Sequence, residues 1–169
     1  MQELIAYMVT WTTYGTWLQG DERGYVKNGE TLEPNPNLKE SNLSCLKQQI
    51  TKLTLKQKDT ARNAILEEAK RINHNIHAIA VCSNHIHIVA ENNHLPIYQA
   101  VKRYKNVATA ALKRTGLNAK LWTKGFDKRF CFTEKQLKQR IEYVDKHNRE
   151  NEYNKTNKRT TNPLARQGG

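Results

Sequence analysis

An alternation of histidine and apolar residues at residues 85–89, which read His-Ile-His-Ile-Val, constrains the fold of this chain most strongly. Successive side chains of a β-strand point to opposite faces, so His85 and His87 share one face while Ile86 and Ile88 share the other. The isoleucine face predicts a strand that covers a hydrophobic core. The two imidazoles would lie about 7 Å apart, twice the rise per residue. They could form half of a divalent-metal site, or a half-exposed strand could simply place two histidines outward.

The surrounding segments predict further strands and helices. Strands are expected at residues 4–11, 74–82, 85–89 and 128–132, and helices at about 54–72, 95–115 and 133–148. Thr54 with Gln57, and Thr133 with Gln136, match the capping box that begins many helices. The Ser83-Asn84 pair between the second and third strands predicts a turn, and therefore an antiparallel hairpin.

At 169 residues the chain is long enough to bury the core of one domain. We assign that domain to residues 1–150. Residues 27–43 contain Asn28-Gly29 and Pro34-Asn35-Pro36-Asn37, which break any regular period, so they are interpreted as a loop inserted within the domain. Residues 151–169 are polar and basic, and they are predicted to form a flexible tail.

Several features bear on where the protein works. Cys45, Cys82 and Cys131 are odd in number and widely spaced, which favours reduced thiols over a disulfide framework. No run of eighteen apolar residues is present, so no membrane span is expected. The N-terminus lacks the basic and apolar segments of a secretory signal. Together these features predict a cytoplasmic protein.

The net charge of +12 is unevenly distributed along the chain. Residues 1–50 carry 4 basic and 6 acidic side chains, whereas residues 101–150 carry 14 basic and 5 acidic ones. Such a block indicates a polyanionic partner, most simply a nucleic acid, although a soluble basic surface would look similar. Tyr14 and Trp17 could stack on unpaired bases or close the mouth of the core. The candidates for phosphate contacts, taken as a group, are Lys102, Arg103, Lys105, Lys113, Arg114, Lys128 and Arg129.

The last predicted helix carries a second group of chemical interest. Leu137, Ile141 and Val144 form its apolar stripe, and Tyr143 lies roughly 100° from the middle of that stripe. His147 stands one turn further on the same flank. Three histidines from a strand and a helix would leave metal positions open for a phosphate oxygen and water. A tyrosine hydroxyl is a weak nucleophile at neutral pH, which a metal on the attacked phosphate would offset. The alternative for Tyr143 is a rim residue with a solvated hydroxyl.

The order of these motifs resembles that of a known family. His85-Ile86-His87, followed by a basic helix and then by Tyr143-Val144 late in another helix, resembles the HUH single-tyrosine transposases. The stretches at residues 12–17 and 20–24 (TTYGTW and GDERG) are similar to the REP-associated tyrosine transposases within that group. The resemblance runs from about residue 4 to residue 150.

This resemblance implies an α+β, ferredoxin-like fold, in which helices pack on a four-stranded antiparallel sheet. It implies that His85 and His87 hold Mg²⁺ or Mn²⁺, with His147 at a position that often carries a further polar ligand in the family. Tyr143 would attack a phosphate of single-stranded DNA and leave a 5′-phosphotyrosine and a free 3′-hydroxyl. The partner would be single-stranded DNA beside a hairpin in a repeated extragenic element, bound by a monomer or a homodimer.

Two other functions remain open. The chain could bind single-stranded DNA or RNA hairpins on the same scaffold without catalysis. It could also be a basic RNA-binding or ribosome-associated protein. The latter function explains the positive charge but gives no reason for the histidine pair. The presence of both histidines and the tyrosine favours the enzyme.

Overall fold

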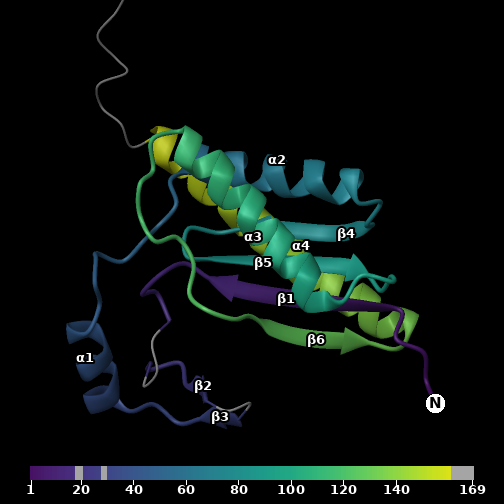
Figure 1. The fold of residues 1–169 in the computed structure, drawn as a ribbon, viewed down its shortest axis with the longest axis horizontal. Helices are drawn as coiled ribbons and strands as arrows, with labels where there is room; N and C mark the ends of the chain where they lie inside the picture. The colour runs from purple at the N-terminus through teal and green to yellow at the C-terminus, as the bar shows by residue number, and fades with distance from the viewer. Residues whose placement is uncertain (18–20, 28–29, 161–169) are drawn as a thin grey trace, which may run out of the picture.

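The structure is a computed structural model that describes residues 1–17, 21–27 and 30–160. Its centre is a four-stranded antiparallel sheet with the strand order β4-β5-β1-β6 (Figure 1). The strands are β1 (Ala6–Thr12), β4 (Ile76–Val81), β5 (His85–Glu91) and β6 (Asp127–Cys131). Because β5 and β1 are the inner strands, hydrogen bonds fix the backbone of the histidine strand on both sides.

Helices cover both faces of this sheet. α2 (Leu55–Arg71) and α3 (Ile97–Arg114) pack on one face, and α4 (Glu134–Thr160) crosses the other. In Figure 1, α3 runs in front of the sheet and α4 behind it. The predicted α+β, ferredoxin-like architecture is therefore confirmed. No helix in the described part of the chain combines the length and the apolar character needed to cross a membrane.

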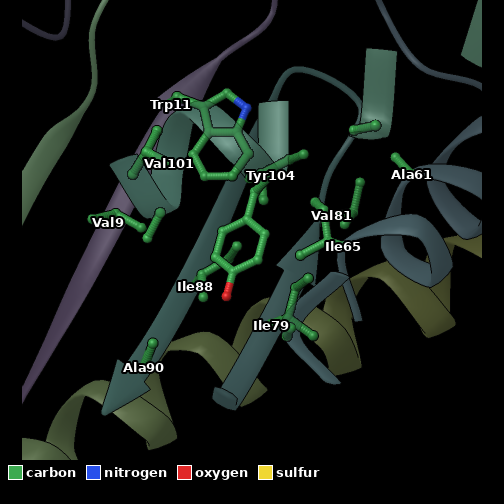
Figure 2. Packing of buried hydrophobic residues seen from close by; sticks show 14 of the residues in the cluster. Val9, Trp11, Ala61, Ile65, Ile79, Val81, Ile88, Ala90, Val101 and Tyr104 are labelled. Carbon is green, nitrogen blue, oxygen red and sulfur yellow. The ribbon is translucent and has the colours of Figure 1, made fainter. Parts of the chain in front are cut away.

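Two hydrophobic cores follow from this layering. In β1, Tyr7, Val9 and Trp11 face α2 and α3, whereas Ala6 and Met8 face α4. Both sets are buried, so residues 6–9 form an unbroken apolar run, as expected for a strand covered on two sides. Figure 2 shows the larger core, where Val9 and Trp11 lie beside Val101 and Tyr104 of α3. The three cysteines are free thiols, as predicted.

The local signals at the starts of the helices are largely confirmed. Thr54 and Gln57 form the full capping box at the start of α2. At the start of α4, Thr133 accepts a hydrogen bond from the backbone N–H of Gln136, as a capping box requires. The Gln136 side chain, however, accepts from the N–H of Phe132 instead of Thr133. The second box is therefore only half formed.

The interpretation of residues 27–43 as a loop was wrong. β3 (Glu30–Leu32) pairs with β2 (Tyr25–Lys27), and α1 (Pro36–Ser44) follows. The side chain of Asn35 caps α1 by accepting from the N–H of Leu38, and Pro36 occupies the first helical turn. Asparagine and proline were interpreted as breakers, but at these positions they begin a helix. Residues 28–29 lie outside the described residues.

The predicted end of the last helix was also wrong. We expected it near Asn148, but α4 continues to Thr160. No glycine or proline interrupts this stretch, and two contacts hold its second half. Asn151 donates to the backbone oxygen of Val81 at 3.4 Å, and Lys155 lies 3.8 Å from the Asp59 carboxylate on α2. The flexible tail stays a prediction for residues 161–169, which lie outside the described residues.

Candidate active site

Three histidines and one tyrosine meet between β5 and α4. The ring centres are 4.6 Å apart for His85 and His87, and 4.6 Å apart for His87 and His147. The Tyr143 ring lies 4.7 Å from that of His147 and 5.4 Å from that of His87. One ligand nitrogen from each histidine lies within 4.8 Å of the other two. All four residues singled out from the sequence thus come together within one chain.

Strand pairing positions the two histidines of β5. His85 lies opposite Thr12 of β1, while His87 lies opposite Thr10 on one side and Ala80 of β4 on the other. Alanine at this position leaves room for the imidazole beneath α4. His87 is only 5% exposed and His85 is half-buried. The histidine face of β5 is therefore not an open surface, since α4 covers this face with the second core.

Side-chain packing and one hydrogen bond position α4. Leu137 and Val144 are buried in the second core, which sets the rotation of the helix. Asn148 donates to the backbone oxygen of Ile79 at 2.9 Å and so satisfies an outward carbonyl of the edge strand β4. The flank with Tyr143 therefore faces the histidines. The Tyr143 side chain is 46% exposed, so a substrate can reach the phenol.

In two of the histidines, Nδ1 forms a hydrogen bond with an oxygen of the protein. His85 Nδ1 lies 2.6 Å from the Asn84 amide oxygen, and His147 Nδ1 lies 2.9 Å from the backbone oxygen of Tyr143. Both oxygens are acceptors, so each Nδ1 carries the proton and donates it. Nε2 of each ring is then left with a free lone pair, which is the form that binds a metal.

His87 completes this arrangement. Its Nδ1 lies 2.7 Å from the Thr10 hydroxyl oxygen. Its Nε2 is buried and has no hydrogen-bond partner among the described residues. Leaving such a nitrogen unpaired costs about 1–3 kcal/mol. An electron-pair acceptor at this nitrogen would remove the cost, so the arrangement fits a metal ion held by the three histidines.

The electrostatics of the site favour neutral imidazoles. Burial lowers the pKa of His85 to about 4 and that of His87 to about 3, and the neighbouring imidazoles contribute to both shifts. Neutral imidazole is the form that ligates metals. Of the two predicted ions, Mn²⁺ accepts nitrogen ligands more readily than Mg²⁺, which prefers oxygen.

The predicted phosphate-contacting residues are not gathered at the histidines. The α3 residues of that set belong to the layer on the opposite face of the sheet. There Lys105 donates to the backbone oxygens of Thr123 and Gly125 at 3.1 and 2.7 Å, which leaves little of its ammonium group for a phosphate. On β6, Lys128 lies opposite a residue of the larger core. Arg129 alone among them lies on the α4 face, and it pairs with Asp127 at 3.1 Å.

Sequence reasoning missed four residues around this site. Arg140 and Lys146 stand three positions before and after Tyr143, so helical spacing puts both beside the phenol, and the sequence already carried that signal. Asn84 was interpreted only as a turn residue. Thr10 could be found only through the cross-strand register, which single residues do not reveal.

The chain is similar to known proteins in both sequence and fold. A family model described as "Transposase IS200 like" matches residues 38–147, which include the histidine strand and Tyr143. A solved structure of a REP-associated tyrosine transposase bound to a REP hairpin shares the fold, with a TM-score of 0.53 and 14% identity over 85% of this chain and 67% of that chain. A putative transposase from Deinococcus radiodurans gives a TM-score of 0.46 and 12% identity over 87% of this chain and 93% of that chain. No curated protein sequence matched.

Proposed function

This chain belongs to the IS200-like transposase family, and on that premise we propose that it cleaves and rejoins single-stranded DNA through Tyr143. The observation that carries the proposal is the contact of an exposed phenol with a cluster of three histidines. A tyrosine kept only for packing would not need this neighbourhood. The expected reaction is a phosphoryl transfer, in which positioning and charge stabilisation supply most of the catalysis.

The proposed chemistry follows from the residues present. Tyr143 Oη attacks the phosphorus of a DNA phosphodiester, a P–Oη bond forms and the P–O3′ bond breaks. The phenol proton passes to solvent, and the 3′ oxygen leaves as a hydroxyl after taking up a proton. The resulting 5′-phosphotyrosine conserves the phosphoester bond, so that another 3′-hydroxyl can later displace the tyrosine and rejoin a strand.

His85, His87 and His147 would hold Mn²⁺ or Mg²⁺, presenting Nε2 toward it. A bound ion would draw charge from the attacked phosphate and orient it. Thr10 and Asn84 hold the rings of the two β5 histidines in place, as outer hydrogen-bond partners of metal ligands commonly do.

We propose a single-stranded DNA substrate that flanks a hairpin. The solved relative that shares this fold was bound to a REP hairpin, and the basic second half of the present chain suits such a polyanion. Exposed members of the predicted set and the two cations beside Tyr143 would contact phosphates: Lys102, Arg103, Lys113, Arg114, Lys128, Arg129, Arg140 and Lys146. The reaction would take place in the cytoplasm. Because Tyr143 contacts the histidines of its own chain, a monomer or each subunit of a homodimer could carry a complete site.

A covalent-adduct assay tests the proposal. The protein is incubated with hairpin oligonucleotides that carry single-stranded flanks, with Mn²⁺ or with EDTA, and separated on a denaturing gel. We expect a retarded protein–DNA band with Mn²⁺ and none with EDTA. Hairpin binding without any adduct would favour the alternative of a binding protein without catalysis. Stronger binding to RNA than to the matched DNA would favour an RNA-binding protein.

Salt dependence provides a prediction about the interface. Each phosphate contact on single-stranded DNA contributes about −0.7 to the slope of log K against log salt concentration. The double variant Arg140→Gln/Lys146→Gln should therefore reduce the magnitude of the slope by about 1.4, twice that contribution. Fluorescence anisotropy across a salt series measures it.

The double variant Lys102→Gln/Lys113→Gln, on the opposite layer of the molecule, is the matched comparison with the same loss of charge. An unchanged slope for that pair would remove α3 from the interface. An unchanged slope for the Arg140 and Lys146 pair would instead mean that DNA does not pass beside Tyr143.

A further inference from the structure

Arg23 is exposed on a loop, yet several contacts hold its guanidinium in place. Nε and Nη2 donate to the two carboxylate oxygens of Asp21 at 2.7 and 3.0 Å, and Nη2 also donates to the backbone oxygen of Thr16 at 2.9 Å. The guanidinium carbon lies 4.6 Å from the centre of the Trp17 ring. The Arg23 side chain nevertheless remains 45% exposed. These contacts hold the planar guanidinium in one orientation while part of it stays accessible to solvent.

The supporting turn is itself well fixed. Asp21 is 3% exposed, and the hydrogen bond from Arg23 is the largest cause of a lowered pKa, about 2, for its carboxyl group. The N–H of Gly24 donates to the backbone oxygen of Asp21 at 2.9 Å. Gly24 has a φ of +81°, and a Cβ there would lie 3.0 Å from the backbone oxygen of Leu32. Another residue would therefore strain the turn that aligns Asp21 and Arg23.

This loop is attached to the histidine strand. Thr13 donates from its N–H to the backbone oxygen of Asn84 at 2.9 Å, and the Thr16 hydroxyl donates to the same oxygen at 3.2 Å. Asn84 in turn orients His85 through its side chain. The guanidinium is thus linked to the metal-site candidate through a short chain of hydrogen bonds.

The contacts of Arg23 involve Nε and Nη2 of its guanidinium but not Nη1. Nε has one N–H and Nη2 has two, and all three are engaged by Asp21 and Thr16. Nη1 carries two further N–H groups, which have no partner within residues 1–17, 21–27 and 30–160. A pair of N–H groups in a fixed plane suits the oxygens of a phosphate.

We propose that Arg23, aligned by Asp21 and Trp17, is a phosphate-binding subsite that holds one backbone phosphate of the DNA beside the histidine cluster. It fixes the register of the strand and so determines which phosphodiester lies next to Tyr143. This inference rests on the proposed function, because it assigns the subsite to the same DNA strand.

The charges around Arg23 determine how this subsite can contribute to DNA affinity. Lys39 lies 3.7 Å from Asp21 and 3.5 Å from Glu22, so the two cations and two carboxylates of the cluster cancel. Attraction at long range is therefore weak, and recognition depends on directional hydrogen bonds from Arg23. The expected effect is a loss of affinity at one defined phosphate rather than a general loss for all DNA.

Neutral-phosphate scanning tests the proposal. In hairpin DNA with a single-stranded flank, each flank phosphate in turn is replaced by an uncharged methylphosphonate, and anisotropy measures binding to the Tyr143→Phe protein, which does not depend on cleavage. One position should lose about tenfold in affinity, as expected for a charge-assisted hydrogen bond. Adding Arg23→Gln should weaken binding to unmodified DNA by the same factor and abolish the further loss at that position. Arg23→Lys should give an intermediate profile, since it keeps the charge but not the fork.

Arg149→Gln, which removes an exposed arginine of α4, serves as the control and should leave the position-dependent profile unchanged. A purely structural role for Arg23 would weaken binding at all positions alike and keep the tenfold step. A uniform loss of that kind, or an unaltered affinity of Arg23→Gln, would overturn the proposal. If the glutamine variant does not fold, the binding profile of Arg23→Lys tests the proposal in its place. If the parent protein binds no hairpin DNA, the proposed function fails as well. If it binds and the chain with Tyr143 intact forms the adduct, but no position depends on Arg23, the subsite alone fails.

Discussion

Replacing Tyr143 with phenylalanine is expected to abolish formation of the covalent DNA adduct, by more than about 10³-fold, while hairpin binding stays within about twofold. The variant removes only the oxygen that would form the new bond to phosphorus. The ring and its contacts with His87 and His147 remain. Because the side chain is 46% exposed and lies outside the buried cluster of α4, the fold should not change. Denaturing gels quantify the adduct and anisotropy quantifies binding.

Tyr153→Phe is the matched control for this variant. Tyr153 lies on the same helix and is 68% exposed, but it stands ten residues further, about 15 Å along the axis. Its adduct yield should equal that of the unmodified protein. If Tyr143→Phe still forms the adduct and Tyr153→Phe does not, the nucleophile has been assigned to the wrong tyrosine.

Loss of either β5 histidine is expected to lower metal-dependent cleavage by about 10²- to 10⁴-fold, since a metal supplies several kcal/mol at the reacting phosphate. His85→Ala and His87→Ala each leave two imidazoles of the three that lie within 4.8 Å of one another. His85→Ala should cost little stability because the residue is only half-buried. His87→Ala removes a side chain that is 5% exposed and leaves Thr10 without its partner, so its melting temperature should fall further.

Calorimetric titration with MnCl₂ separates the two effects. Both variants should bind Mn²⁺ more weakly than the unmodified protein, and added Mn²⁺ should raise its melting temperature more than theirs. His94→Ala, at an exposed histidine outside the cluster, should behave like the unmodified protein. Full cleavage by both His85→Ala and His87→Ala at low Mn²⁺ would exclude the β5 histidines as ligands.

Much of the fold could be predicted because its signals are local. The alternation in β5, the capping box at Thr54, and the helix expected at about residues 95–115 each depend on a few neighbouring residues. The grouping of Tyr143 with His147 also depends on helical spacing alone. That Tyr143 and His147 lie beside the β5 histidines could not be predicted from local spacing, because it depends on the fold. The resemblance to a transposase family supplied that prediction.

The parts that were missed depend on contacts between distant segments. Asn151 and Lys155 hold the second half of α4 against β4 and α2. No local sequence pattern predicts those partners. The basic residues of α3 read as one patch in the sequence, yet the sheet separates them from the histidines. Lys105, for example, donates hydrogen bonds to backbone oxygens of residues 123 and 125. Charge counted along a chain does not reveal which face carries it.

Mapping the residue that carries the DNA tests the central claim most directly. The Mn²⁺-dependent adduct is digested with nuclease and protease, and the peptide that bears the remaining nucleotide is sequenced by mass spectrometry. The account predicts a 5′-phosphate ester on Tyr143, formed with release of a free 3′-hydroxyl. A nucleotide on any other residue, or an adduct that forms equally well after chelation of the metal, would contradict it.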